Sequence, residues 1–150
     1  MTVTDILKFL HVFFAIVWVG GGVMFQFLLA RAKSVGPEMV GHFNSLAEWT
    51  SNRVFMPASF LTLGFGIATV IVGGYEWNEM WINIGFVGFL LSAIIGMAVL
   101  GPTSKKMKAL VAERGPNDPV VTHMGRRLDL FGKIDLIILI VVVFMMVTKP

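Results

Sequence analysis

The sequence predicts an all-α integral membrane protein, a four-helix bundle that forms a single domain over residues 1–150. Three observations predict this fold class. Only 14% of the residues are charged and 56% are hydrophobic, whereas soluble domains carry about 25% charged residues. Four windows each have about the length of the ~20 mostly apolar residues that cross a bilayer. The lysines and arginines gather in two of the three segments between these windows.

The predicted spans cover residues 6–30, 54–73, 81–100 and 128–148. The first span differs from a secretory signal because its apolar core exceeds the ~7–15 residues of such a signal and Asp5 offsets Lys8. We therefore expect it to be retained as a helix. Before the second span, apolar residues between Met39 and Leu46 recur at helical spacing, which predicts a short interfacial helix.

The positive charges orient the predicted spans across the membrane. The segment between the first two spans holds Arg31, Lys33 and Arg53, while the middle loop carries Glu76 and Glu79 and no cation. The segment between the last two spans holds Lys105, Lys106, Lys108, Arg114, Arg126 and Arg127. Because short loops rich in lysine and arginine stay in the cytoplasm, both termini are predicted to lie outside. We expect a multi-pass protein of the cell (inner) membrane.

Two stripes of small residues indicate how the spans pack. Gly88, Ser92 and Gly96 lie four residues apart in the third span. The stripe in the second span consists of Thr62, Gly66, Thr69 and Gly73. Small residues let helix backbones approach closely within a membrane. We therefore expect a compact bundle in which both stripes lie at helix contacts.

His11 is an ionisable side chain in an otherwise apolar helix. At 3.6 residues per turn it shares a face with Ala15, Trp18 and Gly22. Small residues beside a tryptophan and a histidine favour an inward-facing seam, with His11 roughly 9 Å inside the outer boundary. Two interpretations remain. His11 is hydrogen-bonded to a neighbouring helix or to water, or it is an axial ligand of haem or of a metal ion.

Longer stretches around His11 carry a family resemblance. The segment LKFLHVFFAIVWVGGGVMFQFLLARA resembles the first helix of a broad group of small four-helix bacterial membrane proteins. The group includes the copper-resistance D-like proteins and the HemJ-type protoporphyrinogen oxidases. With AEWTSNRVFMPAS, ERGPNDPVV and the terminal VTKP, the chain is most similar to the predicted integral membrane proteins called DUF2269. That family has no established function.

The resemblance implies two ligands. In the HemJ-type proteins the first-helix histidine, here His11, is associated with haem, which implies a haem b site in this chain. Beyond Arg31 the polar motifs of that group do not match, so the resemblance implies no oxidase activity. The likeness to the copper-resistance D-like proteins implies copper handling as a third hypothesis.

Side chains near the other outer helix ends are the candidate partners of a haem at His11. Met145 and Met146 lie at about the depth of His11 and would give His/Met ligation, which raises the haem potential. Lys8 and Lys149 lie at the same outer edge, where they would meet the propionates. The alternative is that the methionines fill gaps and the lysines extend to the membrane surface.

Asp135 is the other charge inside a predicted span. A carboxylate at this depth is costly unless it is paired or faces the bundle interior. We expect Asp135 to pair with Arg31 or Arg53, and the alternative is a role as a proton relay. We expect Lys133 to reach the cytoplasmic face or to pair with Asp129 one turn earlier.

Two further histidines lie in the basic segments. His42 and His123 belong to loops that are neighbours in a bundle, which makes them candidates for a shared metal site. Two histidines fall short of the three or four ligands that zinc takes. Solvated surface positions are the alternative.

The sequence shows no catalytic motif and contains no cysteine, so no enzyme activity is assigned. The net charge of +3 follows the loops and forms no stripe, which excludes nucleic acid as a partner. Two classes of function remain. One is a haem-binding or redox-linked membrane protein that uses His11. The other is a non-catalytic subunit, assembly factor or scaffold, whose partners are the bilayer, other membrane subunits or further copies of the chain.

Overall fold

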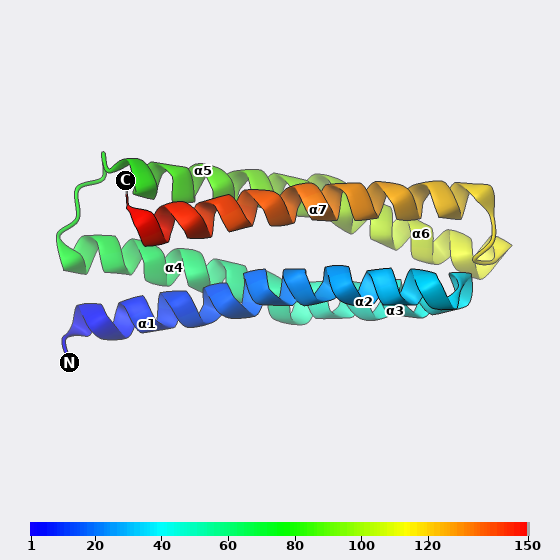
Figure 1. Cartoon of the computed structure of the whole chain (residues 1–150), viewed down its shortest axis with the longest axis horizontal. Helices are drawn as coiled ribbons and strands as arrows, with labels where there is room; N and C mark the ends of the chain where they lie inside the picture. Colours follow the sequence, from blue (N-terminus) through cyan, green and yellow to red (C-terminus); the bar gives the residue numbers. More distant parts are fainter. Residues whose placement is uncertain (150) are drawn as a thin grey trace.

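The computed structural model describes residues 1–149, and nearly all of them are helical, with no strand in this range. Four long helical elements run alternately up and down in one bundle (Figure 1). They cover Val3–Val35, Pro37–Gly73, Met80–Arg114 and Pro119–Thr148. Each element is long enough and apolar enough to cross a membrane. The predicted all-α fold with four transmembrane helices is confirmed.

Three of the four long elements contain a π-helical turn. The bounds are α1 (Val3–Ala15) and α2 (Gly21–Val35) around the turn Ile16–Gly20, α3 (Pro37–Thr50) and α4 (Met56–Gly73) around the turn Ser51–Phe55, α5 (Met80–Ile94) and α6 (Gly101–Arg114) around the turn Ile95–Leu100, and the uninterrupted α7 (Pro119–Thr148). A π-helical turn inserts one residue into a helix and is frequent at functional sites.

Prolines account for two of these turns. Pro57 and Pro102 each lie just after a π-helical turn. A proline inside a helix has no N–H to donate, and its ring clashes with the carbonyl of residue i−4. The widened turn moves the preceding bonds by one residue, so that Met56 N–H donates to the carbonyl of Ser51 and Gly101 N–H to that of Gly96. Both helices therefore continue past their prolines.

The two ends of the bundle differ. Both chain termini and the loop at residues 74–79 lie at one end, which we call the terminal end (Figure 1). The turns at Gly36 and Gly115 lie at the other, which we call the basic end. Their φ angles of 145° and 83° lie in the region that favours glycine. Both termini therefore share one side of the bundle, while the side of the membrane stays a prediction.

The helices pair differently at the two ends. At the terminal end, close backbone contacts join α1 to α4 and α5 to α7. Toward the basic end, α3 packs against both α2 and α6, and α7 contacts α2 and α6. Figure 1 shows the same change, with two helix pairs that draw together from the terminal end toward the basic end. The bundle is thus more open where His11 lies.

Small residues lie at the helix contacts, with one exception. In α4, a side chain at Gly66 would meet the ring of His11, and one at Gly73 would meet Tyr75. In α5, Gly88 lies against Val142 and Ile138 of α7, and Ser92 is buried. Gly96 has nothing within 4 Å, so its predicted place in the stripe is wrong. Gly96 belongs to the π-helical turn, and the inserted residue turns it off that face.

The long elements exceed the thickness of a bilayer. Their 30 to 37 residues correspond to roughly 45–55 Å of helix, against a hydrocarbon core of about 30 Å. The helix expected before the second span is present as α3, and it continues into α4 along the bundle instead of crossing its end (Figure 1). The charged residues near Gly36 and Gly115 place the surplus length at the basic end.

Ion pairs connect the helices near the basic end. The Asp129 carboxylate of α7 lies 3.0 Å from the Lys133 ammonium one turn later, as expected, and 2.7 Å from that of Lys33 in α2. Lys108 of α6 lies 3.3 Å from Glu48 of α3. These partly exposed ion pairs contribute little stability each, and they join α2 to α7 and α6 to α3.

A candidate binding cavity at the terminal end

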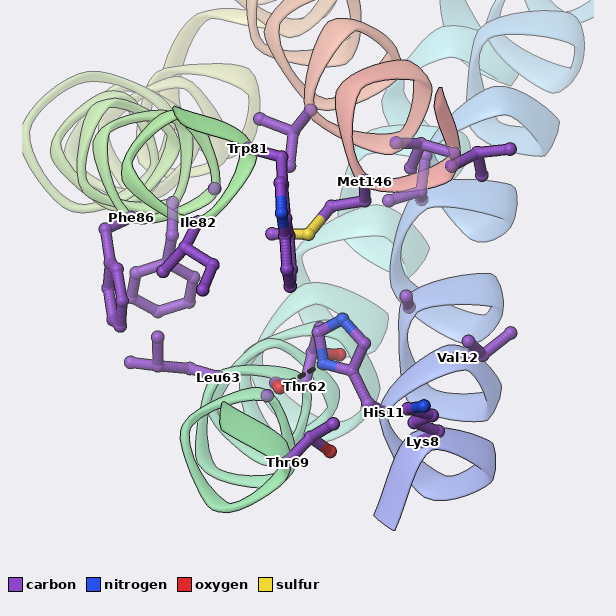
Figure 2. A pocket seen from close by; sticks show the side chains of 18 of the residues that line it. Lys8, His11, Val12, Thr62, Leu63, Thr69, Trp81, Ile82, Phe86 and Met146 are labelled. Carbon is purple, nitrogen blue, oxygen red and sulfur yellow. Dashed lines mark hydrogen bonds between the residues drawn. The ribbon is translucent and has the colours of Figure 1, made fainter. Parts of the chain in front are cut away.

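A cavity of about 550 Å³ lies between the two helix pairs at the terminal end (Figure 2). This volume falls within the ~300–1,000 Å³ of typical cofactor and ligand sites. Its walls are almost entirely apolar. The polar or amphipathic side chains that line it are Lys8, His11, Trp18, Thr62, Thr69, Tyr75, Trp81 and Lys149. The cavity has the composition of a site for an apolar ligand with a few fixed polar contacts.

The His11 ring is held in one orientation by α4. Its Nδ1 atom lies 2.8 Å from the carbonyl oxygen of Thr62. A carbonyl oxygen can only accept, so in this bond Nδ1 carries the hydrogen and donates it. In the neutral ring Nε2 is then an unprotonated acceptor. Figure 2 shows the ring between α1 and α4, with its second nitrogen turned toward Trp81 and Met146. The prediction that His11 points into the bundle and is hydrogen-bonded to a neighbouring helix is confirmed.

A glycine makes this approach of the histidine possible. A Cβ atom at Gly66 would lie 2.9 Å from His11 Nδ1 and 3.0 Å from Cε1. Contacts this short would force the ring to move, and the bond to Thr62 would be lost with it. The second stripe of small residues therefore has a local purpose: it leaves room for the imidazole.

Trp18 lies beside the cavity as its spacing from His11 predicts. It lines the wall from the π-helical turn and packs edge-to-face on Phe89 of α5, with ring centroids 5.8 Å apart. Gly22, the next residue expected on this face, instead lies against Leu136 of α7. The π-helical turn Ile16–Gly20, which contains Trp18, adds one residue before Gly22 and so rotates Gly22 off this face by about 100°.

Of the two candidate methionines, the structure places one in the cavity. Met146 lines the wall, and its methyl group lies against Gly85 of α5, where a side chain would displace it. Met145 does not line the cavity. The lining residues Leu139 and Val142 lie seven and four positions before Met146, on one helical face, and Met145 is about 100° away from that face.

Two lysines lie near the Tyr75 ring at the mouth of the cavity. The Lys8 ammonium lies 5.4 Å from the centroid of the Tyr75 ring, and the Lys149 ammonium lies 5.2 Å from the same centroid. Lys149 also lies 4.9 Å from the centroid of Trp81. The neighbouring Lys8 ammonium, together with the positive charge of Lys149, holds the pKa of Tyr75 below its usual value.

Of the two aromatic rings at the mouth, the sequence offers Tyr75 as a residue that could stand opposite His11, and it predicts no place in a site for Trp81. Sequence position marks Tyr75 and Trp81 as interfacial anchors, which is the usual role of such residues at a membrane surface. The structure brings both rings to the lysines and to the cavity wall. Tyr75 follows the predicted end of the second span by two residues and Trp81 begins the third, but these positions do not reveal which lysines the rings meet.

The prediction that Asp135 pairs with Arg31 or Arg53 is wrong. No ion pair within residues 1–149 joins Asp135 to Arg31 or Arg53. Arg53 is exposed, and the Arg31 guanidinium donates to the Ser34 hydroxyl. Asp135 instead faces the buried Ser92 of α5, and its Oδ1 atom has no hydrogen-bond partner in the described part of the chain. Both arginines lie on outward surfaces, so neither reaches this helix contact.

The two histidines near the basic end do not line a common cleft. His42 lines a smaller cleft of about 320 Å³ between α3 and α6, together with Glu38 and Lys108. His123 is exposed and does not line this cleft. Over residues 1–149 no group of three or more His, Cys, Asp or Glu side chains is placed to hold a metal ion. The shared metal site at His42 and His123 is not supported.

Comparison with known proteins gives a family and no function. No curated protein matches the chain, and no solved structure matches it. One family of predicted integral membrane proteins matches residues 5–150, which is nearly the whole chain. Its description agrees with the four membrane-length helices of the structure. The chain belongs to this family, DUF2269.

Proposed function

We propose that the protein binds haem b in the cavity at the terminal end, with His11 Nε2 as an axial ligand. The observation that carries this proposal is the bond from His11 Nδ1 to the Thr62 carbonyl. Histidines that bind metals almost always donate their other ring N–H to a carbonyl or carboxylate, which fixes the tautomer and the ring orientation. His11 has this arrangement, with Nε2 turned into an apolar cavity.

The other side chains of the cavity fit the same ligand. Met146 offers a thioether sulfur on the wall of α7, which makes it the candidate second ligand. Lys8 and Lys149 lie at the mouth, where they would bind the propionates. Trp18 and Trp81 supply flat apolar walls. When bound, haem would supply one-electron chemistry, and the apolar walls would set its potential by excluding water.

Absorption spectroscopy tests this proposal. The protein, purified in mild detergent, is titrated with haem, and we expect a shifted Soret band at one haem per chain. His11→Ala should abolish this shift, whereas His42→Ala, a histidine outside the cavity, should retain it. Met146→Leu should change the spectrum and the reduction potential without abolishing binding. Identical titrations for His11→Ala and the unmodified protein would overturn the proposal.

Copper is the competing ligand at the same donors. Imidazole and thioether groups also suit copper(I), and the likeness to the copper-resistance D-like proteins points the same way. A parallel titration with copper(I) separates the two. Binding of copper and not haem, lost in His11→Ala, would replace the proposal with a copper-handling function. If neither ligand binds, the non-catalytic role as a subunit, assembly factor or scaffold is the one supported.

We further infer that the protein resides in the cell (inner) membrane with both termini outside. The support is the gathering of lysine and arginine in the segments near the basic end. The cavity and its lysines would then open at the outer surface, away from the cytoplasm.

A further inference from the structure

We infer that Lys8, Tyr75 and Lys149, the mouth cluster, form a binding site for the anionic headgroup of an amphiphile whose apolar body occupies the cavity. This inference goes beyond haem binding, because it requires no metal and no role of His11. It assigns a ligand class to the cavity as a whole: a carboxylate or phosphate attached to an apolar body.

The first argument is the charge at the mouth. The two ammonium groups lie 5.4 and 5.2 Å from the centroid of one ring, and over residues 1–149 neither forms an ion pair with a carboxylate. Asp5, the acidic residue closest to Lys8 in the chain, accepts the Thr2 backbone N–H at 2.8 Å and caps α1. Asp5 is near enough to interact with the Lys8 charge but forms no ion pair with it, so a bound anion would still lower the repulsion between the two ammonium groups.

The second argument is that three separate parts of the chain build the cluster. Lys8 comes from α1, Tyr75 from the loop after α4, and Lys149 from the end of α7. The Tyr75 ring is held against Trp81 of α5, edge-to-face, with centroids 5.5 Å apart. The ring therefore has a fixed place, and both lysines converge on it. A convergence of this kind differs from lysines that extend separately toward a membrane surface.

The third argument is the polarity of the cavity behind the cluster. The walls are apolar, with residues such as Ile67 and Val142, and the two lysines lie at one end only. A small hydrophilic anion would leave these walls without contacts, and a neutral lipid would leave the lysines without a counter-charge. An anionic amphiphile satisfies both parts.

The fourth argument is access from the bilayer. Val12, Ile16 and Val147 line the cavity, yet they are 52%, 65% and 76% exposed on the outside of the bundle. Side chains that line the cavity and are also exposed mark a wall of the cavity that is open toward the lipid. An amphiphile in the same leaflet can therefore enter sideways with its headgroup already at the level of the mouth cluster.

A pair of matched probes tests this inference. The protein in detergent is titrated with a dansyl-labelled fatty acid and with its methyl ester, which differs only in the negative charge. We expect the acid to bind about tenfold more tightly than the ester, a ratio equivalent to ~1.4 kcal/mol. In the double variant Lys8→Gln/Lys149→Gln the acid and the ester should bind equally. The charge-matched control Lys105→Gln/Lys106→Gln, near the basic end, should keep the preference.

Competition identifies the source of the headgroup. Metal-free protoporphyrin and an anionic phospholipid carry carboxylate and phosphate headgroups on different apolar bodies, and the one that displaces the probe at the lower concentration is the better model of the ligand. Equal binding of acid and ester by the unmodified protein would overturn the inference. So would an equal loss of preference in the control variant. The preference for the acid should persist in His11→Ala, so failure of haem binding and failure of this inference are distinguishable.

Discussion

At His11, one backbone carbonyl decides which ring nitrogen is available to a ligand. The Thr62 carbonyl accepts the hydrogen bond from Nδ1, and Nε2 faces the cavity. Gly66 lies one turn after Thr62 and leaves space for the ring. The histidine, the carbonyl and the glycine thus act as one unit built from two helices, and a change at any of them moves the ring.

A substitution at Gly66 tests this unit. Gly66→Ala places a methyl group 2.9 Å from His11 Nδ1, and we expect it to destabilise the protein by ~1–3 kcal/mol, as overpacking does. Gly64→Ala is the matched control, because Gly64 lies in the same helix with nothing within 4 Å. The control should be stabilising by ~0.5–1 kcal/mol, since glycine is unfavourable inside a helix. Unfolding followed by circular dichroism in detergent measures both, and equal effects would contradict this account.

Tyr75 offers a second test at this scale, because it is the single tyrosine of the chain. Its pKa is lowered by Lys8 and Lys149, so its phenol should ionise at lower pH in the folded protein than after unfolding. The folded state favours the phenolate; stability linked to Tyr75 is therefore fully present above the unfolded pKa near ~10 and is lost as pH falls through the lowered value. Ultraviolet absorption follows the titration. Lys8→Gln should shift the midpoint upward, and Lys106→Gln should leave it unchanged.

Sequence periodicity predicted the inward direction of His11 but not which methionine stands opposite. Met145 and Met146 are neighbours, about 100° apart on a helix. The rotation of α7 about its axis chooses between them, and that rotation depends on contacts such as Met146 against Gly85. Asp135 shows the same limit. Its depth follows from the sequence, but its partner depends on which face of α7 meets α5.

Among the elements, the π-helical turns have the largest effect on how the sequence is read. Each one inserts a residue, so a face assigned at 3.6 residues per turn is not continuous through the turn. His11, Ala15 and Trp18 line the cavity as their spacing predicts, and Gly22 does not. Gly88 and Ser92 are in the contact with α7, and Gly96 is not. Pro57 and Pro102 are the visible signal for two of the turns, and the first turn has no such marker.

The contact between α5 and α7 gives a prediction at this scale. In Gly88→Leu the new side chain would overlap Val142, and we expect a loss of at least ~1–3 kcal/mol in stability together with weaker packing of the pair. Gly96→Leu is the control, because that position is open, and its effect should stay within ~0.5 kcal/mol. Thermal unfolding in detergent compares the two variants. Similar melting temperatures for both would mean that Gly88 is not at a close contact.

For the whole molecule, composition and charge were sufficient to predict four membrane helices with both termini at one end. The helix pairing was not predictable, because apolar windows do not specify their neighbours in a membrane, where no hydrophobic force selects one apolar face over another. The cavity depends on this pairing: α1 with α4 and α5 with α7 leave the space between them. The lengths of α3 and α6 were also missed, because their polar turns fall outside the apolar windows.

The orientation of the molecule gives the last prediction. The chain has no cysteine, so single cysteines can be introduced without a background. We expect a membrane-impermeant thiol reagent to label Asn78→Cys, in the loop at the terminal end, in intact cells. Lys106→Cys in α6 should be labelled only after lysis, because the cations hold the basic end in the cytoplasm. The reverse labelling pattern would show that the molecule has the opposite orientation in the membrane.

The surplus length of the helices has a practical consequence for imaging. Roughly 15–25 Å of helix lies beyond the hydrocarbon core of about 30 Å, and the part beyond the headgroup region would stand clear of a detergent micelle or nanodisc. The part beyond the predicted spans contains the ion pair of Lys108 with Glu48 and lies at one end of the bundle only. Small membrane proteins are difficult to align in electron micrographs because the micelle hides them. Here the protruding helices would help to determine the orientation of each particle. They also offer a polar surface for crystal contacts or for an antibody fragment.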